Sequence, residues 1–161
     1  MANEYLSRTP TTNGNRRTFT WSGWVKKFET GGGFGRFFES GAIGDRTYFT
    51  YTDTDALRFS EQVSSSNREV LITDARIRDT GSFYHVMIAI DSTQESSIDR
   101  SNIYINGVKQ SELSTDTRSS LDAKFQHNEI GEGHYIGNSA NQAADFQGIM
   151  SDVFMVDGLA L

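Results

Sequence analysis

Short runs of alternating apolar and polar residues, separated by turn-forming segments, constrain the fold of this sequence more than any other feature. In residues 17–27, Phe19, Trp21 and Val25 share one side of an extended chain, and mostly polar side chains share the other. A period of two residues is typical of a strand with one buried face. Helical periodicity is weak throughout, so the sequence predicts an all-β protein.

Eight further runs are rich in β-branched and aromatic residues and have the same character. They are residues 36–40, 47–52, 56–59, 70–73, 83–90, 102–105, 135–136 and 146–156. Helical turns are expected only at residues 119–124 and 138–144, which are too short to support an architecture. Many short strands with regular turns predict a two-sheet antiparallel sandwich. The length suits a single domain, residues 1–161.

Two strand predictions are specific. Asn106-Gly107 lies between two β-rich stretches, and this dipeptide tolerates the positive φ that both central residues of a two-residue hairpin need. Residues 83–90 are apolar on both alternating faces, which favours a central strand covered on both sides. The polar segments 64–67, 92–100 and 114–120 are expected to be loops, and the glycine-rich residues 31–35 a flexible turn.

The charge balance excludes some partners. The net charge is -6, with net +3 in residues 1–50 and net -9 in residues 51–161, and no long run of like charges occurs. A nucleic-acid binder needs a basic face, so no nucleic acid is expected as a partner. No apolar stretch approaches the 18 residues of a membrane span, and no membrane partner is expected. The absence of cysteine excludes disulfides, thiolate metal sites and cysteine nucleophiles.

Four motifs, in this order, resemble the concanavalin A-like lectin and glucanase superfamily in its laminin-G or pentraxin-like form. They lie at residues 19–26, 84–91, 103–108 and 146–153, the last leading to residues 158–161, and together they span nearly the whole chain. The resemblance implies a concanavalin A-like jelly roll whose N-terminal and C-terminal strands lie side by side.

The opening of the chain narrows this resemblance. Residues 5–10 and 14–18 are similar to the subset of such domains found in structural proteins of tailed bacteriophages. The resemblance implies a place in the virion, where the partners are other capsid or tail proteins and copies of the chain itself. Identical copies on a symmetric particle assemble as symmetric homo-oligomers.

The glucanase branch of the superfamily uses paired carboxylates in the pattern Glu-x-Asp-x-x-Glu, and this pattern is absent. The nearest carboxylate pairs, Asp53 with Asp55 and Glu129 with Glu132, are expected to be solvated loop acids. No Gly-x-Ser-x-Gly elbow occurs. The sequence therefore predicts no catalytic residue, no cofactor and no enzymatic activity.

Three histidines lack the spacing of a metal site. His85 is expected to be a hydrogen-bonded structural residue in its strand, whereas His127 and His134 flank an acidic loop and are expected at the surface. The acidic loops 53–55 and 91–99 are candidates for calcium, but ordinary turn chemistry explains both, so no metal ligand is assigned.

Trp24 is a candidate for carbohydrate binding, because strict alternation places it on the side opposite Phe19 and Trp21. Two interpretations stay open for it. Packing under a loop as a structural residue is favoured, and stacking on a sugar ring from an open sheet face is the alternative. Tyr48 and Tyr51 raise the same question with less support.

These observations lead to two hypotheses. The first is a non-enzymatic virion structural protein, a capsid decoration or cement protein with a lectin-like fold. The alternative is a glycan-binding adhesion module of a phage tail or fibre, and a domain of a longer tail protein is a third reading. A buried Trp24 with a flat apolar patch favours the structural role. A concave aromatic groove with convergent polar groups favours the glycan role.

Overall fold

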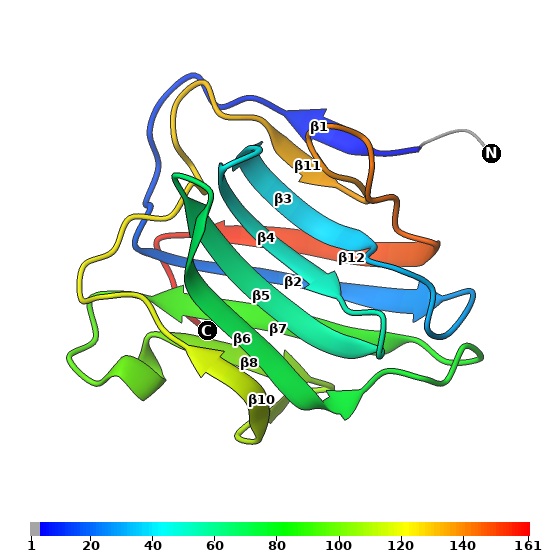
Figure 1. Cartoon of the computed structure of the whole chain (residues 1–161). Helices are drawn as coiled ribbons and strands as arrows, with labels where there is room; N and C mark the ends of the chain where they lie inside the picture. The colour runs from blue at the N-terminus through cyan, green and yellow to red at the C-terminus, as the bar shows by residue number, and fades with distance from the viewer. Residues whose placement is uncertain (1–3) are drawn as a thin grey trace.

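Two antiparallel sheets packed face to face make up residues 4–161, the part of the chain that the computed structural model describes (Figure 1). Sheet A has seven strands in the order β1, β11, β3, β4, β5, β6, β10, and sheet B has five in the order β12, β2, β7, β8, β9. The predicted all-β, two-sheet antiparallel sandwich is confirmed. None of the helical segments described is long and apolar enough to cross a membrane.

The bounds of the elements follow. Sheet A consists of β1 (Leu6–Arg8), β3 (Arg36–Ala42), β4 (Asp45–Tyr51), β5 (Ala56–Val63), β6 (Ser66–Arg76), β10 (Leu113–Thr117) and β11 (His134–Ile136). Sheet B consists of β2 (Thr18–Lys27), β7 (Tyr84–Asp91), β8 (Ser101–Ile105), β9 (Val108–Lys109) and β12 (Gly148–Asp157). A short 3-10 helix, η1, covers Ser97–Asp99.

All nine predicted strands are present, but two other expectations are wrong. Residues 119–124 and 138–144 form turns and bends with no helix. Residues 113–117, assigned mostly to a polar loop, form the edge strand β10, which pairs with β6. Because β10 is largely exposed on both sides, its sequence carries no apolar alternation that would reveal a strand.

The first long strand and the last strand are neighbours, as the resemblance implied. β2 pairs along its length with β12, with Phe19 opposite Asp157 and Trp24 opposite Ser151. β1 precedes them in the sequence but joins the edge of sheet A through β11 (Figure 1). Segments from the two ends of the chain therefore form neighbouring edges of both sheets.

The register of sheet A aligns apolar side chains in one row across its inner face. The row runs through Leu6, Ile136, Phe38, Phe49, Phe59 and Leu71, on six successive strands. A bulge in β3 between Arg36 and Phe38 also directs Phe37 into the core, where it is fully buried.

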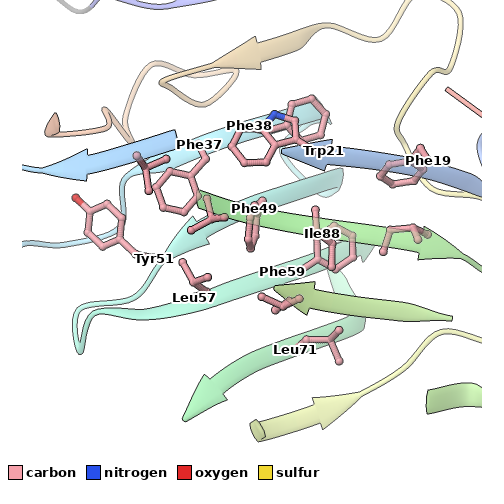
Figure 2. Packing of buried hydrophobic residues seen from close by; sticks show 14 of the residues in the cluster. Phe19, Trp21, Phe37, Phe38, Phe49, Tyr51, Leu57, Phe59, Leu71 and Ile88 are labelled. Atoms are coloured by element: carbon pink, nitrogen blue, oxygen red, sulfur yellow. The ribbon is translucent and has the colours of Figure 1, made fainter. Parts of the chain in front are cut away.

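Sheet B supplies the other half of the core. The side chains predicted to meet inside are all at most 1% exposed; they are Phe19, Trp21, Val86, Ile88 and Ile90. Aromatic rings connect the two layers (Figure 2). The Trp21 ring stacks on Phe37 at 6.1 Å between centroids and meets the edge of Phe49 at 5.5 Å.

A second row on the inner face of sheet A is polar. It runs through Arg8, His134, Ser40, Thr47, Glu61 and Glu69. Residues 119–133 lie against this end of the sandwich and bury Phe125 and His127 there.

Glu61, in the polar row, accepts hydrogen bonds from the Thr47 hydroxyl and, at 3.0 Å, from Arg68 Nη2. Burial raises the pKa of Glu61 to about 8, and these two partners only partly oppose the shift.

The predicted central strand, β7, lies in the middle of sheet B, but it is not covered on both sides. Val86, Ile88 and Ile90 are buried inside, whereas His85 and Met87 on the outer face are half-exposed. Of its outward apolar residues, Ala89 is buried and Met87 forms part of a surface. The Asn106-Gly107 hairpin is confirmed, with φ of 50° and 77° at the two residues.

Gly107→Val tests the hairpin, because a β-branched residue resists positive φ. No atom outside the neighbouring residues lies within 4 Å of a Cβ built at Gly107, so the change adds backbone strain without a clash. We expect a loss of about 1–3 kcal/mol in the free energy of unfolding, measured by urea denaturation. Gly107→Asn should lose less stability, because asparagine tolerates the left-handed region. Equal stability of Gly107→Val and the unaltered chain would contradict the strain argument.

Glu61 should make stability depend on pH. Its pKa is about 8 in the folded chain, above the ordinary value of 4.5, so the folded chain keeps a proton that the unfolded chain releases between these values. The contribution of Glu61 to stability is therefore present below pH 4.5 and is lost as the pH rises through 8. Glu61→Gln removes this titration, and its free energy of unfolding should fall less between pH 5 and pH 8. The control is Glu112→Gln at an exposed position. Identical pH profiles for Glu61→Gln and the unaltered chain would overturn the assignment.

Candidate functional site

Three arginines surround Tyr48 on the outer face of sheet A. The guanidinium carbons of Arg36, Arg46 and Arg58 lie 3.9, 5.2 and 5.6 Å from the centroid of the Tyr48 ring. Strand geometry explains the cluster. Arg46 precedes Tyr48 by two residues on β4 and so shares its face. Arg36 and Arg58 pair with Thr50 from either side, which places them on the same face one step further along.

One buried carboxylate partly neutralises these arginines. Glu39 is fully buried and accepts a hydrogen bond from Arg36 Nε at 2.9 Å, and Arg46 Nη1 lies 3.6 Å from the same oxygen. Its other oxygen accepts a hydrogen bond from the backbone N–H of Ala140 at 2.8 Å. Burial lowers the pKa of Arg36, and the charge of Glu39 opposes this shift. Three positive charges facing one negative charge leave the cluster cationic.

Arg58 is the arginine of the cluster that has no carboxylate partner within residues 4–161. Its Nε donates a hydrogen bond to Ser60 Oγ at 2.9 Å, which orients the side chain without neutralising it. Arg46 Nε is oriented in the same way by Gln62 Oε1 at 2.6 Å. The terminal nitrogens of Arg58 are therefore available to an anion.

These arginines form the floor of a groove of about 430 Å³. The loop before β3 and the loop between β11 and β12 also contribute residues to its walls. The lining consists of Phe34, Arg36, Arg46, Tyr48, Arg58, Gln62, Ser139, Asn141, Ala143 and Ala144. The Phe34 ring, in the loop between β2 and β3, is 48% exposed and offers a stacking surface. None of the described residues that line the groove is a carboxylate. The arrangement can therefore bind an anion beside an aromatic ring, but it lacks the acids of a glycosidase.

Sequence reasoning did not find this groove. It gave little support to sugar stacking by Tyr48 and Tyr51, and these side chains are 4% and 1% exposed. Tyr48 lies beneath the guanidinium groups, and Tyr51 packs on Phe37 in the core at 5.9 Å between ring centroids. The alternation of Arg46 and Tyr48 is a partial signal, but Arg36 and Arg58 join them only through the register of three strands.

Trp24 lies on the outer face of sheet B, as alternation predicted, but the favoured packing under a loop is wrong. Its side chain is 41% exposed. The C-terminal residues Leu159 and Leu161 form hydrogen bonds with Thr20 further along the same face and leave Trp24 exposed. The Trp24 ring lies 5.3 Å from that of His85. Together with Phe83, Ile149 and Phe154, which are 43%, 47% and 61% exposed, these residues form a surface that we call the Trp24 face.

The three histidines lie in different surroundings. His85 is half-buried beside Trp24, and its backbone N–H donates to Asn106 Oδ1 at 2.9 Å. The prediction of a surface position for the other two is wrong. His127 is fully buried with its ring 4.4 Å from Phe19, because its segment directs alternate side chains into the sandwich. His134 is half-buried and accepts a hydrogen bond from the Asn128 N–H at 3.0 Å.

The candidate acids also lie in different surroundings. Asp55 was expected in solvent, but it is 4% exposed, forms a buried ion pair with Lys27 and accepts a hydrogen bond from the Gly31 N–H at 2.9 Å. Glu129 forms an ion pair with Arg16 at 2.6 Å. Asp91 accepts hydrogen bonds from Thr93 and Gln94, which is turn chemistry. Within residues 4–161, no three histidine or acidic side chains lie together as a metal site.

Comparison with known proteins agrees with the architecture. A family model described as the concanavalin A-like lectin/glucanases superfamily matches residues 2–159. No curated protein sequence matches the chain. Among solved structures, the heptameric SAP-like pentraxin of Limulus polyphemus is similar, with a TM-score of 0.62 and 18% identity, over 94% of this chain and 68% of the pentraxin.

Two further structures are similar in fold. The LG4-5 domains of the mouse laminin alpha1 chain give a TM-score of 0.66 at 11% identity, over 98% of this chain and 40% of theirs. The CBM40 of Ruminococcus gnavus IT-sialidase, bound to alpha2,3 sialyllactose, gives 0.60 at 10% identity, over 94% and 90%. Because the family model covers nearly the whole chain, this protein belongs to the concanavalin A-like lectin/glucanase superfamily.

Proposed function

We propose that this chain is a non-enzymatic glycan-binding module, and that the groove of sheet A recognises acidic sugars. The observation that carries the proposal is the group of three arginines around Tyr48, which faces the single carboxylate of Glu39. A planar guanidinium matches a carboxylate with two parallel hydrogen bonds. The exposed ring of Phe34 at the rim adds a surface on which a sugar ring stacks.

The charge of the chain sharpens this proposal. The net charge is -6, so an acidic polymer is repelled by most of the surface. A cationic groove in an acidic protein directs such a ligand to one place, and salt weakens the attraction. The similar CBM40 structure, which is described with sialyllactose bound, supports the fit of this fold to an acidic sugar.

The absence of enzymatic activity is part of the proposal. Hydrolysis of a glycosidic bond needs two carboxyl groups on either side of the bond. Two glutamates that face each other across β5 and β6, Glu61 and Glu69, lie on the inner face of sheet A, and both side chains are 0% exposed. A sugar in the outer groove has no access to them.

Arg58→Gln should weaken acidic-sugar binding at least tenfold, because a charge-assisted hydrogen bond contributes about 1.5–3 kcal/mol. The probe is alpha2,3 sialyllactose, and isothermal titration calorimetry measures its affinity. Lactose lacks the carboxylate, so it should bind the unaltered chain and Arg58→Gln with equal affinity. Lys109→Gln, at an exposed position of sheet B, is the matched charge control. Equal affinities for sialyllactose and lactose, or unchanged affinity in Arg58→Gln, would overturn the role of the groove.

The structural role was expected to go with a buried Trp24, and Trp24 is exposed. A second role therefore rests on the exposed Trp24 face instead. We propose that this face attaches the chain to copies of itself and to capsid or tail proteins, so that it decorates a bacteriophage virion. Its aromatic side chains are exposed on the sheet opposite the groove, and the similarity of residues 5–10 and 14–18 to phage structural proteins supports the location. The similar pentraxin is described as heptameric. Modest contacts repeated over a symmetric lattice gain strength through avidity.

Trp24→Ser should weaken self-association at least tenfold, as expected for an aromatic residue at the centre of an interface. Analytical ultracentrifugation over a concentration series measures the change. The control is Ile43→Ser, which removes an apolar side chain of 65% exposure from the turn between β3 and β4. If Ile43→Ser lowers the association constant as much as Trp24→Ser does, the assignment is contradicted.

Saturable binding of the purified chain to particles that lack it tests the virion location.

A further inference from the structure

The free edge of sheet A holds an apolar side chain in solvent. β1 pairs with β11 on one side, and no strand within residues 4–161 pairs with it on the other (Figure 1). In an edge strand, alternate residues direct their backbone N–H and C=O groups away from the sheet. Leu6, in β1, is 70% exposed, the highest value among the large apolar side chains described. The free backbone edge and the exposed leucine together indicate a partner strand.

Two charged residues flank Leu6 on the same side of the chain. Glu4 and Arg8 each lie two residues from Leu6, and alternation places the three side chains on one face. The hollows along this edge agree, because one is lined by Glu4 and Leu6 and the next by Leu6 and Arg8. Within residues 4–161, neither Glu4 nor Arg8 forms an ion pair or a side-chain hydrogen bond. Both charges are therefore available to a partner.

The order of these charges makes the segment complementary to a second copy of itself. In an antiparallel pair with Leu6 opposite Leu6, Glu4 of each copy lies opposite Arg8 of the other. Side chains directly opposite each other have Cβ atoms about 4.5–5.5 Å apart, so opposite charges attract there and like charges repel. A parallel pair in the same register would place Glu4 opposite Glu4. The charges therefore select the antiparallel arrangement.

The other free edges lack this complementarity. β12 contains two aspartates and no base, and a bulge between Ser151 and Phe154 interrupts its row of backbone groups. Bulges and charges of this kind hinder pairing with a further strand. β10 contains one acid and no base, and β9 is only two residues long. Among the described edges, the edge at β1 is therefore the one suited to a second copy.

We infer that two copies of this chain join edge to edge through residues 4–8, with Leu6 on the two-fold axis and Glu4 of each copy paired with Arg8 of the other. The apolar row on the inner face of sheet A ends at Leu6, and it then continues into the second copy. The interface is separate from the Trp24 face, which is on the outer side of sheet B.

This pairing fixes the relative direction of two arginine grooves. The two-fold axis of an antiparallel strand pair is perpendicular to the sheet, so the outer faces of both copies point the same way. Two grooves then lie on one side of the dimer, and a polymer with repeated acidic groups gains avidity by binding both. This consequence rests on the proposed function of the groove, whereas the pairing itself does not.

Charge reversal tests the pairing. All chains in the series carry Trp24→Ser, which removes the association proposed for the Trp24 face. Glu4→Arg and Arg8→Glu each place like charges opposite each other at two positions, so each should dimerise roughly tenfold more weakly than Trp24→Ser alone. A one-to-one mixture of the two variants restores opposite charges at both positions and should form a heterodimer at roughly the original affinity. Analytical ultracentrifugation measures these association constants.

Two controls separate the pairing from net charge. The double variant Glu4→Arg/Arg8→Glu exchanges the charges and should dimerise by itself as Trp24→Ser does. Lys109→Glu changes the net charge as Arg8→Glu does, but at an exposed position of sheet B, and should leave dimerisation unchanged. A Trp24→Ser chain that stays monomeric, or a mixture that associates no more tightly than either variant alone, would overturn the pairing.

A cysteine on the two-fold axis tests the register, since the chain has no cysteine of its own. Leu6→Cys places two thiols directly opposite each other, within reach of a disulfide. The two Ser7 positions are diagonal neighbours about 7–8 Å apart, which is too far. Oxidised glutathione should therefore link Leu6→Cys into a covalent dimer roughly tenfold faster than Ser7→Cys, as measured by non-reducing gel electrophoresis. Equal rates would overturn the register. All the altered side chains of residues 4–8 are exposed, so these variants should fold normally.

Discussion

The register between the strands of sheet A is the constraint on which the rest of this structure depends. Side chains alternate between the two faces of a strand, so the register of each pair decides which residues share a row. Phe38, Phe49 and Phe59 share the central apolar row inside, and the arginines gather around Tyr48 outside. A slip of one residue would exchange these faces and place cationic groups in the core. The packing of the core and the position of the groove therefore have one cause.

The same register explains why one end of the sandwich is polar inside. Thr47, Glu61 and Glu69 follow one another across β4, β5 and β6, next to the apolar row. Polar groups in such a place need partners, and residues 119–133 supply several of them. The backbone N–H groups of Ser119 and Gln126 donate hydrogen bonds to Glu69 and Thr47. This irregular segment is held by hydrogen bonds to the row beneath it as well as by the burial of Phe125.

The sequence was sufficient for the architecture but not for the candidate site, and particular residues show why. β2 and the Asn106-Gly107 turn were predictable because their signals lie within a few neighbouring residues. The arginine groove depends on pairing among three strands, which no local pattern reveals. His127 looked exposed because its neighbours in the sequence are polar, whereas its burial depends on a segment packing across the sheet. Alternation placed Trp24 on the correct face, but only the finished sandwich shows that its side chain is exposed.

The two proposed roles fit together because the two outer faces of a sandwich point in opposite directions. The groove is on the outside of sheet A and the Trp24 face is on the outside of sheet B, so the core separates them. Because the outer faces point away from each other, one partner would have to wrap around an edge of the sandwich to contact both. A chain seated on a particle through Trp24 therefore presents its arginines to the surroundings. The capsid hypothesis and the adhesion hypothesis then describe two sides of one molecule, and each can fail without the other.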